Sequence, residues 1–131
     1  MVRVTTFSVT NKTNGRLPRL PFLDIKNAVL GKQYKASLVF AGNSLSRILN
    51  KRYRKKNKPA NVLSFSLEKN AGEIFIDMEE ARREARANKR ALKNHVGYLL
   101  IHGLFHLKGY RHNSTMEKEE VRIRKNFSIH I

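Results

Sequence analysis

Three histidines, His102, His106 and His112, have the residue type and the spacing of a metal site. His102 and His106 are four residues apart, so on an α-helix they lie on one face, one turn from each other. Gly109 follows where a helix can end in a left-handed residue, which lets the chain reverse and bring His112 towards the other two. Three converging imidazoles suit a catalytic zinc ion whose fourth position is left for water. The spacing therefore predicts one Zn²⁺ ion per chain.

Two other interpretations of these histidines need to be weighed. Taken singly, His102 or His106 could be a core histidine with its ring N–H satisfied by a backbone carbonyl. The complete pattern, H-x-x-x-H-x-x-G-x-x-H, is also that of metzincin proteases. Such proteases place a glutamate general base directly after the first histidine, whereas this chain has Gly103 there. The glycine disfavours a metalloprotease. A metal lowers the pKa of its bound water to about 7, and nearby cations could stabilise the charge that develops on a phosphodiester.

Composition favours a polyanionic partner. The 131 residues include 27 Lys and Arg but only 10 Asp and Glu, and the formal net charge of +17 suits nucleic acid first and an anionic membrane surface second. Without cysteine, any metal must bind nitrogen and oxygen ligands. The N-terminus lacks the apolar run of a signal peptide, and no stretch approaches the ~20 apolar residues of a membrane span. We expect residues 1–131 to form a single domain of a cytoplasmic protein that does not associate with a membrane.

Hydrophobic periodicity predicts the elements that position the histidines. Strands are expected at residues 2–9, 34–40, 62–67 and 73–77, the last two as a hairpin or as neighbours. Helices are expected at residues 21–30, after an N-cap at Asn43, after a capping box at Asp77 and Glu80, through the histidines, and from a capping box at Ser114 and Glu117 to about Phe127. This order predicts an α+β (mixed α/β) fold with a short mixed sheet packed by helices.

The apolar stripes predict which helix faces are buried. The histidine helix is apolar nearly all round and should lie in the centre of the fold. The helix after Asp77 has a small inner stripe of Ala81 and Ala85. The helix after Asn43 is expected to bury an i, i+3, i+4, i+8 stripe of Leu45, Ile48, Leu49 and Tyr53.

Three segments agree in order and spacing with one bacterial enzyme family. HGLFHLKGYRH (residues 102–112) is similar to its signature H-G-x-x-H-L-x-G-Y-D-H. LNKRYRKKNKPANVLSFS (residues 49–66) is similar to L-N-x-x-Y-R…T-D-V-L-S-F-P, and GEIFI (residues 72–76) to G-D-I-x-I. The chain thereby resembles the YbeY family of metal-dependent endoribonucleases. The resemblance implies a small α/β domain with zinc in a basic cleft. It also implies hydrolysis of single-stranded RNA in ribosomal RNA maturation and ribosome quality control, with the ribosome or a small-subunit protein as partner.

The resemblance also implies roles for individual residues. His102, His106 and His112 would hold the zinc, while Arg54 and His106 would be catalytic, with Arg54 near the metal. Without the resemblance, Arg54 would be one of several basic residues on a solvated surface. Basic side chains that could contact RNA phosphates with little sequence preference are Lys51, Arg52, Lys55, Lys56, Arg82 and Arg86. No stacked-aromatic motif of the RNA-recognition type is present, so base-specific readout is not predicted.

Three positions depart from the family pattern. Asn61 and Arg111 stand where the family has Asp, and Ser66 where it has Pro. Arg111 puts a cation beside the third histidine, so we expect these changes to affect metal affinity and catalytic rate while leaving the fold intact. The alternative function is therefore a ribosome- or RNA-binding protein of the same fold with weak catalysis. His95, seven residues before His102, is expected in the core or against a ligand, not on the metal.

Overall fold

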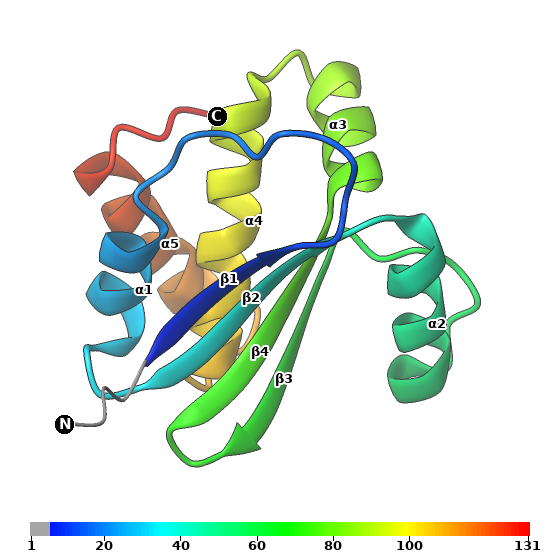
Figure 1. Ribbon diagram of the computed structural model, residues 1–131. Coiled ribbons are helices and arrows are strands. Elements are labelled where there is room, and N and C mark those ends of the chain that lie inside the picture. Colours follow the sequence, from blue (N-terminus) through cyan, green and yellow to red (C-terminus); the bar gives the residue numbers. More distant parts are fainter. Residues whose placement is uncertain (1–5) are drawn as a thin grey trace, which may run out of the picture.

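A four-stranded mixed sheet forms the centre of the computed structural model, which describes residues 6–131 (Figure 1). The strand order is β1-β2-β4-β3. Strands β1 (Phe7–Asn11), β2 (Lys35–Ala41) and β4 (Ala71–Asp77) run parallel, and β3 (Val62–Glu68) pairs antiparallel with β4 as the edge strand. The predicted α+β class and the predicted β3–β4 hairpin are confirmed.

Helices cover the two faces of the sheet unequally (Figure 1). Helix α4 (Leu92–Leu107) crosses one face against β3 and β4, flanked by α1 (Phe22–Leu30) and α5 (Ser114–Asn126). Helix α3 (Met78–Ala87) packs beside α4, whereas α2 (Asn43–Arg54) lies on the opposite face. No helix within residues 6–131 is long and apolar enough to cross a membrane.

Alternation along the strands separates the two faces. Ile74 and Ile76 of β4 are buried on the α4 side, where Leu100 and Leu104 are also fully buried. Phe75, between the two isoleucines, points to the α2 side. The prediction of a buried central helix that carries the histidines is correct, because α4 presents apolar side chains to the sheet and to its neighbouring helices at once.

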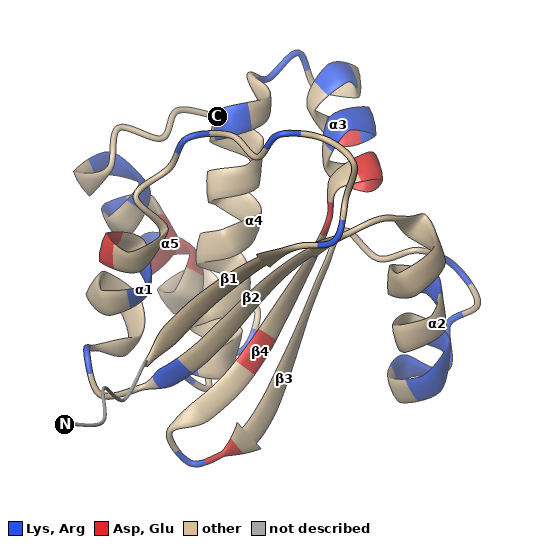
Figure 2. Ribbon diagram, in the orientation of Figure 1, with Lys and Arg blue, Asp and Glu red and all other residues tan. Residues whose placement is uncertain are grey.

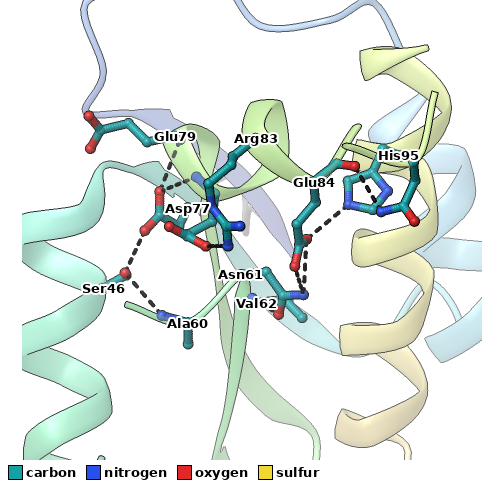
Figure 3. A network of polar contacts seen from close by, with 11 residues as sticks. Ser46, Ala60, Asn61, Val62, Asp77, Glu79, Arg83, Glu84 and His95 are labelled. Atoms are coloured by element: carbon teal, nitrogen blue, oxygen red, sulfur yellow. Dashed lines mark hydrogen bonds and ion pairs between the residues drawn. The ribbon is translucent and has the colours of Figure 1, made fainter. Parts of the chain in front are cut away.

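Polar bonds attach α2 to the rest of the fold. The Ser46 hydroxyl donates to Asp77 Oδ2 at 2.6 Å and accepts from the Ala60 backbone N–H at 3.3 Å (Figure 3). Asn50 Nδ2 donates to the Lys58 carbonyl at 2.8 Å. Ser46 and Asn50 are the buried residues of this helix. These bonds fix α2 to the start of α3 and to the segment that leads into β3.

The predicted burial of the α2 stripe is wrong in part. Ile48 and Tyr53 are 55% and 59% exposed, and Leu45 and Leu49 are only half-buried. Helical periodicity identifies an apolar stripe but not how much sheet is available to cover it. On this face α2 is alone, so the outer half of its stripe meets solvent.

Three predicted element ends also differ. The first strand begins at Phe7, and residues 2–5 of its predicted span lie outside the described part. Gly42 occupies the N-cap of α2, and the Asn43 backbone N–H donates instead to Glu79 Oε2 at 2.6 Å. Asn113, not Ser114, caps α5, because its side chain accepts from the Met116 N–H at 2.9 Å.

Candidate functional site

The C-terminal end of α4 turns the chain back towards its own histidines. Gly109 has φ of 101°, a left-handed conformation that glycine adopts without steric cost. The Gly109 N–H bonds to the His106 carbonyl at 3.0 Å and the Tyr110 N–H to the Phe105 carbonyl at 3.1 Å. The Phe105 and Tyr110 rings pack edge to face, with centroids 5.4 Å apart. This helix end closes the last turn and directs the following residues, including His112, back over α4.

Three imidazole nitrogens converge there. His106 Nε2 lies 3.1 Å from His102 Nε2 and 3.2 Å from His112 Nε2. One ligand atom from each residue fits within 4.8 Å of the others. In a tetrahedral zinc site with Zn–N of about 2.05 Å, neighbouring nitrogens are about 3.3 Å apart. The donor set and its separations therefore fit a small divalent ion held by three histidines.

A buried carboxylate supports the first histidine. His102 Nδ1 lies 3.3 and 3.4 Å from the two oxygens of Glu120, which comes from α5. A carboxylate only accepts, so His102 donates from Nδ1 and keeps its Nε2 lone pair for a metal. Sequence reasoning missed Glu120. The available signal was an acid within the inward stripe of α5, between Met116 and Ile123, both of which are buried.

The surroundings of His106 favour its neutral form. Burial is the main cause that lowers its pKa, and repulsion from His102 and His112 adds to it. A hydrogen bond with the Tyr110 backbone and the charge of Glu120 act in the opposite direction. Neutral imidazole is the form that binds metals.

A cavity of about 790 Å³ opens in front of the histidines. It lies along the outer edge of β3, between the C-terminal end of α2 and the C-terminal half of α4. Arg54, the last residue of α2, lines this cavity together with the histidines. The other residues that line it are Tyr53, Asn61, Val62, Leu63, Ser64, Phe65, Ser66 and Leu107.

A second, cationic groove continues from the cavity. It has a volume of about 480 Å³ and shares Arg54 and Asn61 with the cavity. Lys56, Lys58 and Arg83 also line it, together with Glu80, which pairs with Arg83, and Glu84. A phosphodiester chain that leaves the cavity along this groove would meet more positive than negative side chains.

The predicted RNA-contact residues are divided among separate surfaces (Figure 2). Lys56 lines the cationic groove. Lys51, Arg52 and Lys55 are exposed at the C-terminal end of α2 and do not line the cavity or the groove. Arg82 and Arg86 line a third depression, on the outer side of α3.

A polar network joins the cavity wall to α4 (Figure 3). Asn61 Nδ2 donates to both oxygens of Glu84, at 3.2 and 3.1 Å. Glu84 Oε1 also lies 3.0 Å from His95 Nε2, and Arg90 approaches His95 Nδ1 at 3.4 Å. Arginine only donates, so His95 accepts at Nδ1 and donates at Nε2 to Glu84. His95 is buried and lies outside the histidine cluster. An aspartate at position 61 would face the Glu84 carboxylate, so asparagine suits this pairing.

The two other residues that depart from the family pattern, Ser66 and Arg111, differ in their relation to the cavity. Ser66 lines the cavity. Arg111 is exposed and is not among the residues that line it. At position 103 a Cβ would lie only 3.0 Å from Ser64 Oγ and 3.1 Å from Val62 Cγ2. Helix α4 therefore cannot carry the glutamate of a zinc protease there without moving off β3.

Comparisons with known proteins agree on one family. The model of the family described as Endoribonuclease YbeY matches residues 20–130. Proteins named Endoribonuclease YbeY from Gluconobacter oxydans and Ehrlichia canis are 40% and 42% identical over 87 residues, or 65% and 63% of this chain. The chain spans 52% and 56% of those two proteins, about half of their length. The protein of that name from Alkaliphilus metalliredigens is 35% identical over 107 residues, 73% of this chain and 69% of its own length.

A solved structure has the same fold. The solution structure of TM1509 from Thermotoga maritima is similar with a TM-score of 0.62 over 92% of this chain and 85% of that one. The two sequences are 21% identical, so this likeness concerns the fold alone.

Proposed function

This chain belongs to the YbeY family, and from that premise we propose that it is a zinc-dependent endoribonuclease that cleaves single-stranded segments of ribosomal RNA precursors. The observation that carries the proposal is the convergence of the Nε2 atoms of His102, His106 and His112 beside Arg54 in one cavity. The proposed reaction is hydrolysis of a phosphodiester bond.

The three histidines would hold the metal through Nε2, with Glu120 fixing the ring of His102. When bound, Zn²⁺ supplies Lewis acidity, which lowers the pKa of water towards 7 and polarises a phosphoryl oxygen. The protein's own contribution is to hold the ligands at tetrahedral spacing and to keep His106 neutral through burial.

Arg54 is the proposed cation for the reacting phosphate. A guanidinium offers several N–H donors in a fixed plane that matches phosphate oxygens, and it stays charged at any working pH. Its place at the wall shared by the cavity and the cationic groove lets it contact a phosphate that spans both. Lys56 and Lys58 would bind the neighbouring backbone phosphates without sequence preference.

The proposed setting is the cytoplasm, where ribosomal RNA precursors and a small-subunit protein would be substrate and partner. The net charge of +17 supports association with a ribosome, because most of the ribosomal surface presented to it is polyanionic RNA. We also propose that residues 1–131 act as one domain.

Metal analysis together with RNA cleavage tests the function. The purified protein should contain one zinc ion per chain and cleave a single-stranded RNA faster than the same sequence in a duplex. His106→Ala should lose both the metal and cleavage. His130→Ala is the matched control, because His130 is exposed and lies outside the cluster. Cleavage that survives in metal-stripped His106→Ala would contradict the proposal.

Arg111 motivates a second candidate, an RNA-binding protein of this fold with weak catalysis. Its positive charge stands directly before His112 in the sequence, where the family pattern has Asp. Tight RNA binding without cleavage at saturating zinc would favour this candidate. Arg111→Asp distinguishes the two: faster cleavage in this variant with unchanged RNA affinity would assign the weakness to this residue.

A further inference from the structure

We propose that Tyr53 forms a stacking site for one unpaired nucleobase of the RNA, a proposal that rests on the proposed endoribonuclease function. Tyr53 lines the same cavity as the three histidines and directly precedes Arg54. Tyr53 is 59% exposed, although it belongs to a helical stripe that periodicity assigns to the core. An aromatic ring that stays exposed beside a candidate phosphate-cleaving site is suited to bind a flat, partly apolar ligand.

Two other rings support Tyr53 from behind. Its centroid lies 5.0 Å from that of Phe65, which in turn lies 5.8 Å from Phe75 in an edge-to-face contact. The row therefore runs from the sheet outward to the cavity, and both Tyr53 and Phe65 line that cavity. Contact with Phe65 limits the motion of the tyrosine ring while the rest of its surface stays accessible.

The backbone beside Tyr53 is also fixed. Helix α2 ends one residue later at Arg54, and Lys55 adopts a left-handed φ of 58°. Asn50 holds the same end of the helix through its bond to the Lys58 carbonyl. Tyr53 and Arg54 thus present a ring and a cation from adjacent positions, which matches the alternation of base and phosphate along a nucleotide strand.

The chemistry of the site defines the ligand class. A cavity of about 790 Å³ is within the 300–1,000 Å³ range of small-molecule sites, so it accommodates a nucleotide. Every nucleobase has a π-face, so stacking on Tyr53 would not select a sequence. Stacking does require an unpaired base, because in a duplex both faces of a base are already covered. Tyr53 would thereby give the cavity its preference for single strands.

A fluorescent base measures the stacking directly. A short single-stranded RNA that contains 2-aminopurine should lose fluorescence on binding, because stacking on an aromatic ring quenches this base. Tyr53→Leu keeps apolar bulk but removes the π-face, and should weaken single-strand binding by about 5- to 100-fold and abolish the quenching. Tyr53→Phe should retain both properties. Ile48→Ala, an exposed apolar residue on the same helix outside the cavity, is the matched control and should behave like the wild type.

Three results would overturn the proposal: unchanged affinity and quenching in Tyr53→Leu, an equal loss in Ile48→Ala, or an equal loss of duplex binding in Tyr53→Leu. Crosslinking provides a measurement that needs no variant. A single-stranded RNA with 5-iodouridine should crosslink to Tyr53 of the wild-type protein upon irradiation, and crosslinks mapped elsewhere would contradict stacking there.

The same titration in the His106→Ala background separates this proposal from the proposed function. In that background cleavage should be lost while quenching and its dependence on Tyr53 remain. Quenching that depends on Tyr53 in a protein that never cleaves RNA would refute the nuclease and leave the stacking site standing. Cleavage with no effect of Tyr53→Leu on affinity or strand preference would refute the stacking site alone.

Discussion

The two faces of the sheet are built by different physical means. On the α4 face, apolar side chains from four helices (α1, α3, α4 and α5) and the sheet form one continuous core. On the α2 face, one helix is attached through Ser46 and Asn50, and much of its apolar stripe remains in solvent. The cavity lies where the two faces meet at the edge of β3, so each face contributes one wall.

This difference separates the proposed metal binding, on the α4 side, from the proposed substrate contacts, on the α2 side. Two of the three candidate metal ligands, His102 and His106, lie on α4 on the densely packed side, where rotamers are restricted, and the exposed His112 follows the helix end. Tyr53 and Arg54 come from the thinly covered side, where their side chains stay accessible to the proposed substrate. The comparison predicts that substitutions on the α4 side change stability and metal binding, whereas exposed α2 positions that line the cavity change RNA binding alone.

The largest expected contrast lies in core truncation. Leu100→Ala on α4 should lower the free energy of unfolding by about 2–5 kcal/mol, because it leaves a cavity in a fully buried site. Ile48→Ala on α2 should change it by less than about 0.5 kcal/mol. Urea denaturation of both variants measures the difference. Similar losses in the two variants would show that α2 is packed as tightly as α4.

Removal of the buried Glu120 carboxylate should weaken metal binding. Glu120→Gln can no longer accept a charge-assisted hydrogen bond from His102 Nδ1, so zinc affinity should fall about 10- to 100-fold. Glu119→Gln is the control, since Glu119 is only half-buried and pairs with Arg122 away from the histidines. Competition with a chelator of known affinity gives both values. Equal affinities would mean that Glu120 does not orient the ligand.

The polar attachment of α2 is tested at Ser46. Ser46→Ala removes a hydroxyl that bonds to both Asp77 and the Ala60 N–H, and should cost about 1–3 kcal/mol, because the buried Asp77 carboxylate loses one of its donors. Ser44→Ala, on the exposed side of the same helix, should be nearly neutral. Hydrogen exchange should show faster opening of α2 than of α4 in Ser46→Ala. Unchanged stability would assign the attachment to the half-buried leucines.

The smallest expected effect is a pH dependence of stability at Asp77, where α2 is bonded to the start of α3. Burial raises the pKa of Asp77 above 3.8, although bonds from Ser46 and from the Glu79 and Glu80 N–H groups oppose the shift. The folded state then holds this proton more tightly than the unfolded state. The contribution of Asp77 to stability is therefore fully present below pH 3.8 and declines as the pH rises through the raised folded-state pKa. The stability of Asp77→Asn relative to wild type should rise over this interval in denaturation curves, and a fall would contradict the direction.

Local signals in the sequence predicted most of the fold and the centre of the site. The spacing of the histidines and Gly109 is a property of one helix end, so it can be read without tertiary information. Glu120 could not be assigned in the same way, because its contact with His102 depends on how α5 crosses α4. The hydrogen bond between Asn61 and Glu84 joins distant segments, so no local pattern in the sequence could predict it either. The error at Ile48 and Tyr53 has the same origin: periodicity gives the stripe, whereas the topology decides what covers it.

The order of the chain has a consequence for biosynthesis. Every strand and the exposed basic end of α2 precede His102, whereas His112 and Glu120 come after the last strand. Domains generally fold as units, and the core of this one joins the sheet to α4 and α5, which are synthesised last. The sheet therefore becomes stable only once α4 has been made, so the candidate metal ligands are assembled together with the fold itself. A product released before residue 112 would lack His112 and Glu120, and with them both the proposed metal site and part of the core.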